Sequence, residues 1–591
     1  MKRFLLALLS LAWLLSVGGC AIVRSESAAR ILMQVDDIAT GAEQTLPAIV
    51  EIDGQPALLY ATKDNRINFQ YGERRTQLDE TARVRGGNRF QLHRQDQNLH
   101  ALWWSHQDGK NLYFTTSGDS GQRFNPVGVV NDAHGVLPPF NLLRGPEGAV
   151  GISYQDERSP RYQAYFNRST DYGRTWPKPD FRLDTPPAEG KPSAVQDPIS
   201  VESGSAWVTA WVDAVNVEGR VSFRIVSRRS DDAGLVWSPP EVLHTSDKLI
   251  SSLTVRAQGN NIVIAADEHE RGILTFASKD QGRNWRGSGI LAGTGVPEGT
   301  AGANNSGIRM DLADGRAHLL WMEERIGAKT RIMRGSLDIA QARWIDAAQR
   351  LDIKTHDTTR SLLPTVLALP LGPVLAAWVD YRDIRPNIYL SASFDQGQTW
   401  SAPQALLNPG EVSTGWPRLM PWRDQVAIAY DAYPNDRARD GKFVLRLIPI
   451  DKSATALADL VKPSQVSEAE RKAKLEQRVK TLWANRVAGD YERAYDLFDF
   501  AYRAATTKKN YLDNVGVIDY QAFSLEDIAI TGNEAVVKMK IKYEIKSTMM
   551  PNGRTIKVAP VEVEAANSWV WVGNDWYMVY SPSFDQPNLK Y

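Results

Sequence analysis

Short runs in which apolar and polar residues alternate recur along most of the chain, and each run ends in charge. Examples are ALLYATKD at 57–64, AVGISYQDE at 149–157 and VLAAWVDYRD at 374–383. Alternation of this length predicts half-buried β-strands, and a second short run such as NIYLSAS at 387–393 predicts a following strand. The pair of runs returns eight times between about Pro47 and Ile450. The pattern therefore predicts eight similar all-β units.

An eight-residue motif, Ser-x-Asp-x-Gly-x-x-Trp, follows the second run in most units. Good copies are SGDSGQRF at 117, STDYGRTW at 169, SDDAGLVW at 230, SKDQGRNW at 278 and SFDQGQTW at 393, and a degenerate copy spans 335–344. Serine and aspartate side chains bond turn amides, and glycine accepts a positive φ. Because a reaction needs its catalytic motif once, the repetition indicates architecture. The motif aspartates are Asp119, Asp171, Asp232, Asp280, Asp338 and Asp395, with a spacing typical of propeller blades.

These motifs resemble the Asp boxes, or BNR repeats, of sialidase-like propellers. The resemblance implies an all-β propeller of six to eight four-stranded blades over residues 46–451, and the eight runs favour eight blades. The apolar stretch ILMQVDDI at 31–38 is expected to supply the outer strand that completes the last blade. In that family the Asp boxes lie opposite the active face, so the six motif aspartates are expected to be structural.

Strand direction places the loops between second and third strands at the end opposite the Asp boxes. Those loops are rich in carboxylates and arginines, which suit sugar hydroxyls and a ligand carboxylate respectively. The alternative is that neighbouring acids and arginines merely neutralise each other. The candidate ligand-binding residues are Asp156, Asp213, Glu268, Glu324, Asp383 and Asp431.

A second interpretation is enzymatic. Sialidases hold the substrate carboxylate with three arginines and use a tyrosine nucleophile with acidic partners. The resemblance implies candidate catalytic residues here: Arg158, Arg325, Arg382, Tyr381, Tyr430 and Asp380. The Phe-Arg-Ile-Pro stretch that supplies the first arginine is not found, since 361–364 reads SLLP and 415–418 reads GWPR. This departure argues against sialidase activity, which is kept as the alternative. Three arginines within reach of one point, beside a Tyr-Glu pair, would favour the enzyme, whereas scattered, salt-bridged arginines would favour binding or a scaffold.

Charge and composition exclude several other functions. Lysine plus arginine equals aspartate plus glutamate, 69 each, so no net field attracts nucleic acid. The eight histidines show no paired spacing of a zinc site, and no phosphate-binding glycine loop or Gly-x-Ser-x-Gly elbow occurs. We expect no metal and no cofactor.

The N-terminus has the pattern of an export signal. A basic start and a short apolar stretch end in Val17-Gly18-Gly19-Cys20, and Cys20 is the single cysteine of the chain. Residues 1–20 resemble a bacterial lipoprotein signal with its lipobox, which implies lipidation of Cys20 and a membrane anchor. Ala21 after the cysteine favours the outer membrane. The alternative is an ordinary cleaved signal. Residues 21–45 are expected to form a tether and the ring-closing strand.

A linker at 452–465 leads into a second domain at 466–591. Ser467 and Glu470 form a capping-box pattern that opens a charged helix, and a second helix and four strand runs follow. This order resembles NTF2-like α+β domains. The aromatic cluster Trp569, Trp571, Trp576 and Tyr577 is expected to form the core, or alternatively to line a pocket or an oligomer contact.

Together these features predict an envelope lipoprotein whose propeller binds a glycan or an envelope protein at the end opposite the Asp boxes. An exo-acting glycosidase of sialidase type and a non-catalytic assembly scaffold are the two alternatives. Oligomerisation through the C-terminal domain is a further expectation.

Overall fold

The computed structural model describes most of the chain, and the account below concerns those residues. They are 30–41, 46–79, 90–106, 109–159, 161–184, 193–217, 219–296, 303–325, 329–353, 359–383, 385–407, 412–433, 441–448, 466–499, 502–503, 506–515, 517–532, 534–549, 555–572 and 574–579. Cys20 and the predicted linker lie outside them, as does the side chain of Asp383.

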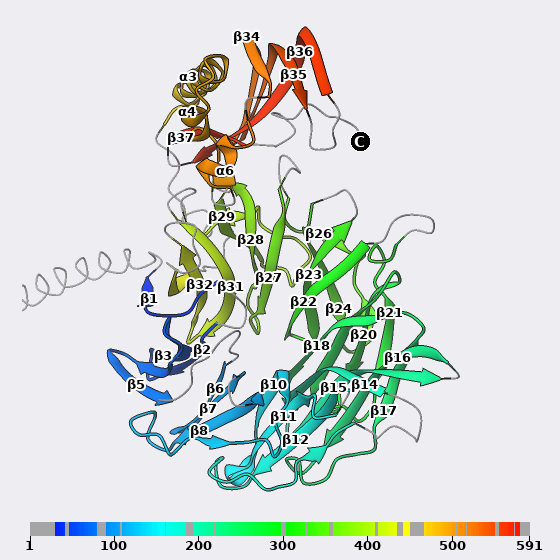
Figure 1. Ribbon diagram of the computed structural model, residues 1–591. Coiled ribbons are helices and arrows are strands. Elements are labelled where there is room, and N and C mark those ends of the chain that lie inside the picture. The colour runs from blue at the N-terminus through cyan, green and yellow to red at the C-terminus, as the bar shows by residue number, and fades with distance from the viewer. Residues whose placement is uncertain are drawn as a thin grey trace, which may run out of the picture.

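Eight antiparallel sheets follow one another along the chain, with strands in sequence order except that β1 joins the last sheet and β26 pairs with β24, and Figure 1 shows them arranged around a centre. Within the described residues, seven sheets have four strands and one has five. The prediction of an all-β propeller with eight blades is confirmed.

The first four blades follow the N-terminal strand β1 (Ile31–Val35), and a 3-10 turn at Pro146–Gly148 connects β10 to β11. Blade 1 consists of β2 (Ala48–Ile52), β3 (Gln55–Ala61), β4 (Ile67–Tyr71) and β5 (Arg74–Asp79); blade 2 of β6 (Phe90–Gln95), β7 (Asn98–Ser105), β8 (Asn111–Ser117) and β9 (Gly128–Val129); blade 3 of β10 (Val136–Arg144), β11 (Val150–Asp156), β12 (Gln163–Ser169) and β13 (Phe181–Arg182); blade 4 of β14 (Ser193–Ser203), β15 (Ala206–Val217), β16 (Arg220–Ser230) and β17 (Glu241–Ser246).

The other four blades continue the same order, and blade 6 carries the additional strand. Blade 5 consists of β18 (Ile250–Gln258), β19 (Asn261–Glu268), β20 (Gly272–Ser278) and β21 (Arg286–Ile290); blade 6 of β22 (Ala303–Ala313), β23 (Arg316–Arg325), β24 (Arg331–Asp338), β25 (Arg343–Trp344) and β26 (Gln349–Arg350); blade 7 of β27 (Ser361–Ala368), β28 (Val374–Asp383), β29 (Arg385–Ser393) and β30 (Gln404–Ala405); blade 8 of β31 (Ser413–Trp422), β32 (Gln425–Tyr433), β33 (Lys442–Ile448) and β1.

The N-terminal strand completes the last blade. β1 pairs antiparallel with β33, and Val35 lies opposite Phe443 in that register. Phe443 packs in one apolar cluster with Leu58 and Tyr60 of β3, so blade 8 is packed against blade 1. The ring is therefore held together by segments from both ends of the propeller sequence.

The five good motif copies share one hydrogen-bond pattern, which explains their repetition. In blade 7, Ser393 Oγ donates to Asp395 Oδ1 at 2.8 Å and accepts from the Gly397 amide at 2.7 Å. Asp395 Oδ1 also accepts from the Thr399 amide at 2.8 Å. Gly397 has a φ of 87°, which glycine adopts without strain. The turn thus satisfies its own amides, in agreement with a structural role.

Arginine side chains link several of these turns to the preceding blade. Arg168 Nε of blade 3 donates to the Ala233 carbonyl of blade 4 at 2.6 Å, and Arg229 Nε of blade 4 donates to the Gln281 carbonyl of blade 5 at 2.7 Å. Because guanidinium donors to backbone carbonyls are charge-assisted, these bonds join neighbouring blades directly.

The described part of the C-terminal domain combines helices with one antiparallel sheet. The helices are α3 (Glu468–Val487), α4 (Tyr491–Tyr495) and α6 (Lys508–Leu512), and the sheet has the order β34 (Asp519–Thr531), β35 (Glu534–Met549), β36 (Thr555–Val572) and β37 (Asp575–Met578). The capping box at Ser467 and Glu470 is formed as predicted. Trp569, Trp571 and Trp576 lie in the core between α3 and the sheet. The likeness to NTF2 domains stays a prediction.

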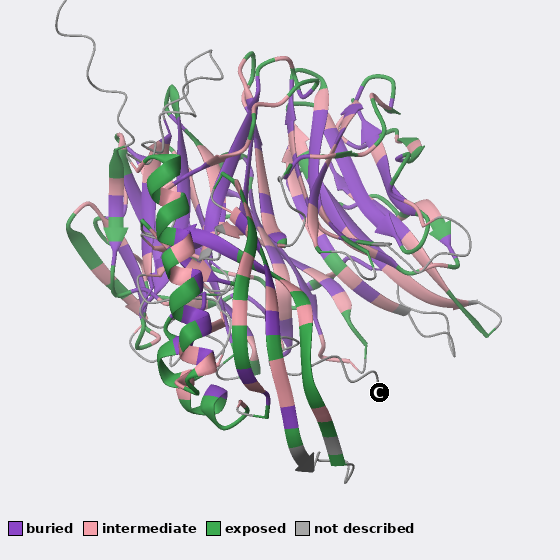
Figure 2. Ribbon diagram, turned by 90° about the horizontal axis from the view of Figure 1, so that it is seen from above, coloured by how far each residue is buried: buried purple, intermediate pink, exposed green. Residues whose placement is uncertain are grey.

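Buried and exposed residues are distributed differently in the two domains. Figure 2 shows buried residues concentrated in the propeller strands, while much of α3 is exposed. β36 contacts β28, so the C-terminal domain lies beside blade 7 (Figure 1). Among the described residues, no helix has the length and apolar character needed to cross a bilayer.

Candidate functional site

Six of the eight innermost strands carry a β-bulge near their first residues. The register breaks in β10, β14, β18, β22, β27 and β31, whereas β2 and β6 pair regularly. In five of the bulges one residue has a positive φ: Asp197 (50°), Ser252 (53°), Gly307 (60°), Leu363 (55°) and Trp416 (56°). Bulges redirect side chains, and four non-glycine residues in this strained region mark the place as a candidate functional site.

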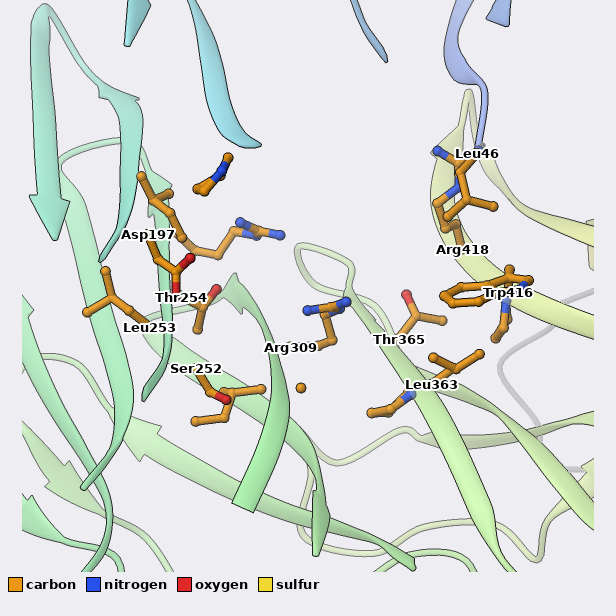
Figure 3. Close-up of a pocket in the computed structure, with 17 residues that line it drawn as sticks. Leu46, Asp197, Ser252, Leu253, Thr254, Arg309, Leu363, Thr365, Trp416 and Arg418 are labelled. Carbon is orange, nitrogen blue, oxygen red and sulfur yellow. The ribbon is translucent and has the colours of Figure 1, made fainter. Parts of the chain in front are cut away.

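The bulges surround a central cavity of about 520 Å³. Its walls come from blades 3 to 8 and from Leu46, and Figure 3 shows the side chains that line it. A cavity of this size lies within the range of small-molecule sites.

Three arginines from three different blades line the cavity. Arg309 is the first paired residue after the bulge of β22, Arg418 is the first after the bulge of β31, and Arg256 lies two residues beyond the bulge of β18. Figure 3 shows Arg309 between the two walls of the cavity. Asp197 is the one carboxylate among the described lining residues, so the lining carries a net positive charge.

Surrounding protein partly desolvates two of these arginines, although the Arg256 side chain stays exposed in the open cavity. Desolvation lowers the pKa of Arg256, and the nearby Asp311 carboxylate opposes that shift. Burial lowers the pKa of Arg418 to about 10, with Asp431 opposing. Arg418 therefore remains cationic at neutral pH. Nε and Nη2 of Arg418 are buried and have no hydrogen-bond partner among the described residues, so these donors are available to an acceptor in the cavity.

The two walls of the cavity differ in chemistry. Figure 3 shows the Trp416 ring beside Leu363 on one wall, and Asp197, Ser252 and Thr254 on the other. The first wall offers an aromatic and an aliphatic surface, and the second offers a carboxylate and two hydroxyls. One ligand with an apolar face and several hydroxyls would match both walls.

The cavity lies toward the end of the propeller opposite the Asp boxes. In blade 7, Ser361 pairs with Asp380, and the bulge of β27 follows within a few residues. At the other end of that blade, Ala368 pairs with Val374, and Val374 pairs with Ser393, the first residue of the Asp box. The bulges and the Asp boxes are thus at opposite ends of the strands.

Two of the predicted arginines are bound within their own blades. Arg382 Nη2 donates to Asp380 Oδ2 at 2.8 Å, and Arg158 Nη2 donates to Asp156 Oδ2 at 2.9 Å. Asp156 and Asp380 are fully buried. Their lone pairs are also used by the amides of the same arginines, at 2.6 Å and 2.9 Å. These pairs neutralise the carboxylates that are buried at the ends of second strands. Neither arginine lines the cavity described above.

The third predicted arginine is arranged similarly. Arg325 Nη2 lies 2.8 Å from Oε1 of Glu323, which is buried, while the predicted ligand residue Glu324 is exposed. Arg158, Arg325 and Arg382 therefore lie in blades 3, 6 and 7, each beside its own carboxylate. These contacts do not bring the three arginines together around one point.

The remaining predicted carboxylates also mark the ends of second strands. Burial raises the pKa of Asp213 to about 6, with a contribution from Asp184. Burial likewise raises the pKa of Asp431 to about 6, although Asp431 accepts from the Gly41 amide at 3.1 Å. Glu268 is buried and accepts from Ser246, Arg271 and His244. None of the three lines the cavity.

The two candidate tyrosine nucleophiles are in different settings. Tyr430 is buried in the apolar cluster between blades 7 and 8, and burial raises its pKa. The Tyr381 ring lies 4.6 Å from the Arg360 guanidinium carbon in a cation–π contact. A raised pKa disfavours the phenolate, so the setting of Tyr430 does not activate a nucleophile. The described residues contain no group of three or more histidine, cysteine, aspartate or glutamate side chains suited to a metal ion.

Sequence reasoning singled out Gly415–Arg418 and Ser361–Pro364 as departures from an arginine motif, but it did not select Arg256, Arg309 or Arg418 as site residues. The signal shared by these strands was weak: of the phrases DPI at 197, SLT at 252, GIR at 307, LPT at 363 and WPR at 416, three have proline second, and no position is the same in all five. Each of these phrases begins with the residue of positive φ.

Comparison with known proteins gives one family match and several matches to solved structures. Residues 149–428 match the BNR repeat-like domain family. No curated protein matches the chain. Solved structures that match include the NanB sialidase of Streptococcus pneumoniae, with 9% identity, TM-score 0.31 and coverage of 72% of this chain and 95% of that chain. A polysaccharide lyase of family PL25, an ulvan lyase, matches with 12% identity, TM-score 0.37 and coverage of 61% and 96%. A protein of unknown function from Dyadobacter fermentans matches with 13% identity, TM-score 0.32 and coverage of 54% and 96%.

Proposed function

We propose that the protein, a sialidase-like BNR-repeat propeller with a cationic cavity at its centre, binds an anionic saccharide in that cavity. The observation that carries the proposal is the convergence of Arg256, Arg309 and Arg418 from three blades on one cavity whose described lining holds a single carboxylate. Guanidinium groups favour carboxylate and sulfate oxygens, to which they donate paired hydrogen bonds.

The other lining residues support a sugar over a simple anion. Trp416 offers an aromatic face on which a pyranose ring packs, and Asp197, Ser252 and Thr254 offer acceptors and donors for hydroxyls. A sulfate or phosphate ion would use the arginines alone. A uronic acid, a sialic acid or a sulfated sugar would use both walls.

Binding is the proposed activity, and hydrolysis is the alternative. The sequence-predicted catalytic residues are distributed over blades 3, 6, 7 and 8, and their charged members are occupied by pairs within a blade. The cavity does bring three arginines together, but its described lining holds no tyrosine and no glutamate, whereas an exo-acting sialidase needs a nucleophile and its acidic partners beside the carboxylate clamp. An assembly scaffold would not require a cationic cavity.

The proposed location is the bacterial envelope. We propose that Cys20 is lipidated and holds the propeller at a membrane, with the outer membrane favoured by Ala21. An envelope protein as ligand and oligomerisation through the C-terminal domain stay proposals of lower rank, because no contact on the described surface carries them.

The test uses the soluble chain that begins at Ala21. Isothermal titration against sialyllactose, a glucuronate disaccharide, a sulfated disaccharide and neutral lactose is expected to give binding for at least one anionic sugar and none for lactose. A fluorogenic sialoside assayed in parallel tests hydrolysis. Equal binding of lactose, or binding of no anionic sugar, would contradict the proposal, whereas turnover of the sialoside would favour the enzyme.

A further inference from the structure

The chain enters the propeller at the Asp-box end of blade 8. β1 begins at Ile31, opposite Arg446 near the end of β33, and the Arg30 carbonyl accepts from the Leu447 amide at 2.8 Å. β33 starts beside the end of β32, where Lys442 pairs with Ala432, and finishes with Ile448 opposite Val426. Because second strands end at the cavity end, Arg30 lies at the other end, with the Asp boxes.

The length of chain before Arg30 limits how the propeller can sit on a membrane. Nine residues lie between Cys20 and Arg30, so ten Cα-to-Cα steps join the two. At full extension they reach about 35 Å. The longer propeller strands, of 10 to 12 residues, span a similar distance at roughly 3.3 Å per residue. With the anchor at Cys20, the cavity end could therefore lie at the membrane only if the chain before Arg30 ran fully extended along the outside of blade 8.

Exposed apolar turns occur at the Asp-box end. Leu371, in the turn between β27 and β28, is 96% exposed. Leu235 and Val236, in the Asp box of blade 4, are 67% and 68% exposed. The other four good Asp boxes have polar pairs at these two positions, QR at 122, RT at 174, RN at 283 and QT at 398. Apolar tips at a rigid surface insert into the headgroup region of a bilayer.

The C-terminal domain does not cover Leu371. β36 contacts β28, yet Leu371 lies three residues before β28 begins and keeps nearly all of its surface exposed. The contact with β36 thus does not cover the turn that carries Leu371.

From the entry point of the chain, the reach of the tether and the apolar turns, we infer that the Asp-box end of the propeller rests on the bilayer and the cavity end faces away from it. The inference rests on the proposed lipidation of Cys20 and not on the proposed ligand. Its consequence is that a ligand reaches the cavity from the aqueous side without passing the membrane.

The test places a fluorophore at single cysteines, because Cys20 is the only native cysteine and is acylated in the lipidated chain. Leu371→Cys and Leu235→Cys report the Asp-box end. Ile353→Cys is the matched control: Ile353 is 66% exposed and follows β26 at the cavity end, where the Leu351 amide donates to the Ile332 carbonyl. The full lipidated chains are reconstituted into phosphatidylethanolamine–phosphatidylglycerol vesicles that contain headgroup-attached nitroxide lipid.

The expected result is loss of fluorescence at positions 371 and 235 and none at 353. Quenching at 353 equal to that at 371, or no quenching at either while the chain floats with the vesicles, would overturn the inference. Flotation of the vesicles reports the anchor separately. The chain that begins at Ala21 is expected not to float, and flotation of that form would contradict the role of Cys20. Neither result depends on whether the cavity binds a sugar.

Discussion

Arg309 in β22 and Arg418 in β31 occupy the same position in two bulged strands, two blades apart. Each is the first paired residue after the register break, opposite Leu320 and Ala429 respectively. Each follows, by two residues, a position of positive φ, Gly307 or Trp416. The repeat of the fold therefore delivers two guanidinium groups to one cavity from segments that are distant in sequence. A shared backbone feature, rather than a local motif, builds the cationic surface.

The arginines predicted from the second-strand ends should behave differently from those of the cavity. Arg382→Met removes the partner of the buried Asp380 carboxylate, and the loss of one member of a buried pair costs about 3–5 kcal/mol. We expect a lower melting temperature, measured by calorimetry, with the affinity of the remaining folded protein for the anionic sugar unchanged. Loss of affinity without loss of stability would instead place Arg382 at the ligand.

The Asp boxes should contribute to stability in proportion to their hydrogen bonds. Asp395 accepts from Ser393 Oγ and from the Thr399 amide, both at 2.8 Å, whereas in the degenerate copy Asp338 accepts from the Gln341 amide at 2.8 Å. Asp395→Ala should destabilise the propeller by about 1–3 kcal/mol, and Asp338→Ala by less. Thermal unfolding of the two variants beside the parent checks this order. Equal effects would show that the extra bonds add nothing.

Two histidines in blade 2 should make the fold sensitive to acid. His93 and His100 lie opposite each other in β6 and β7. Burial lowers the pKa of His93 to about 3 and that of His100 to about 4. The unfolded chain therefore binds more protons, so stability is present above pH 6.5 and is lost as the pH falls toward 4. Each unit of depression corresponds to about 1.4 kcal/mol at most.

The matched pair of variants for this prediction is His100→Gln and His106→Gln, since His106 is exposed. The difference between the melting temperatures at pH 7 and pH 5 is expected to shrink in the first variant and to stay unchanged in the second. A pH dependence identical to that of the parent in His100→Gln would contradict the assignment.

Closure of the ring depends on the inward side of β1. Val35 is 6% exposed and packs in the cluster that joins blades 8 and 1, whereas its neighbour Gln34 is exposed. Val35→Asp buries an unpaired carboxylate and is expected to destabilise the propeller by roughly 3 kcal/mol or more. Gln34→Asp should change stability by less than about 0.5 kcal/mol. Urea titration followed by tryptophan fluorescence distinguishes the two outcomes, and similar midpoints would show that β1 does not hold the ring.

Much of the propeller could be predicted from sequence because its signals are local. The Ser-Asp-Gly motif fixes its own turn through hydrogen bonds between residues two to four apart, so Asp395 and its repeats can be recognised from the sequence alone. Alternation gave the strands, and the apolar stretch at Ile31 indicated the strand that pairs with β33. The capping box at Ser467 was legible for the same reason.

The cavity residues were harder to predict from sequence because their positions depend on backbone geometry between paired strands. The register breaks that direct Arg309 and Arg418 to the cavity arise where an inner strand pairs with its neighbour, and no residue type announces a bulge. Charged loops such as Asp380–Arg382 were more conspicuous in the sequence, yet their charged side chains pair with each other within the blade. Proline follows the positive-φ residue in three of the bulges, at 198, 364 and 417, and this partial pattern is the one sequence feature that points to Trp416 and Arg418.

The measurement that tests the central claim most directly is titration of the strongest-binding anionic sugar into the parent chain, Arg418→Met and Arg309→Met, with melting temperatures recorded for each. Loss of one charge-assisted pair is worth about 1.5–3 kcal/mol, so affinity should fall by about 10- to 100-fold in each variant. Arg325→Met, at the exposed end of β23, should bind like the parent. Unchanged affinity in both cavity variants, with folding intact, would contradict the account.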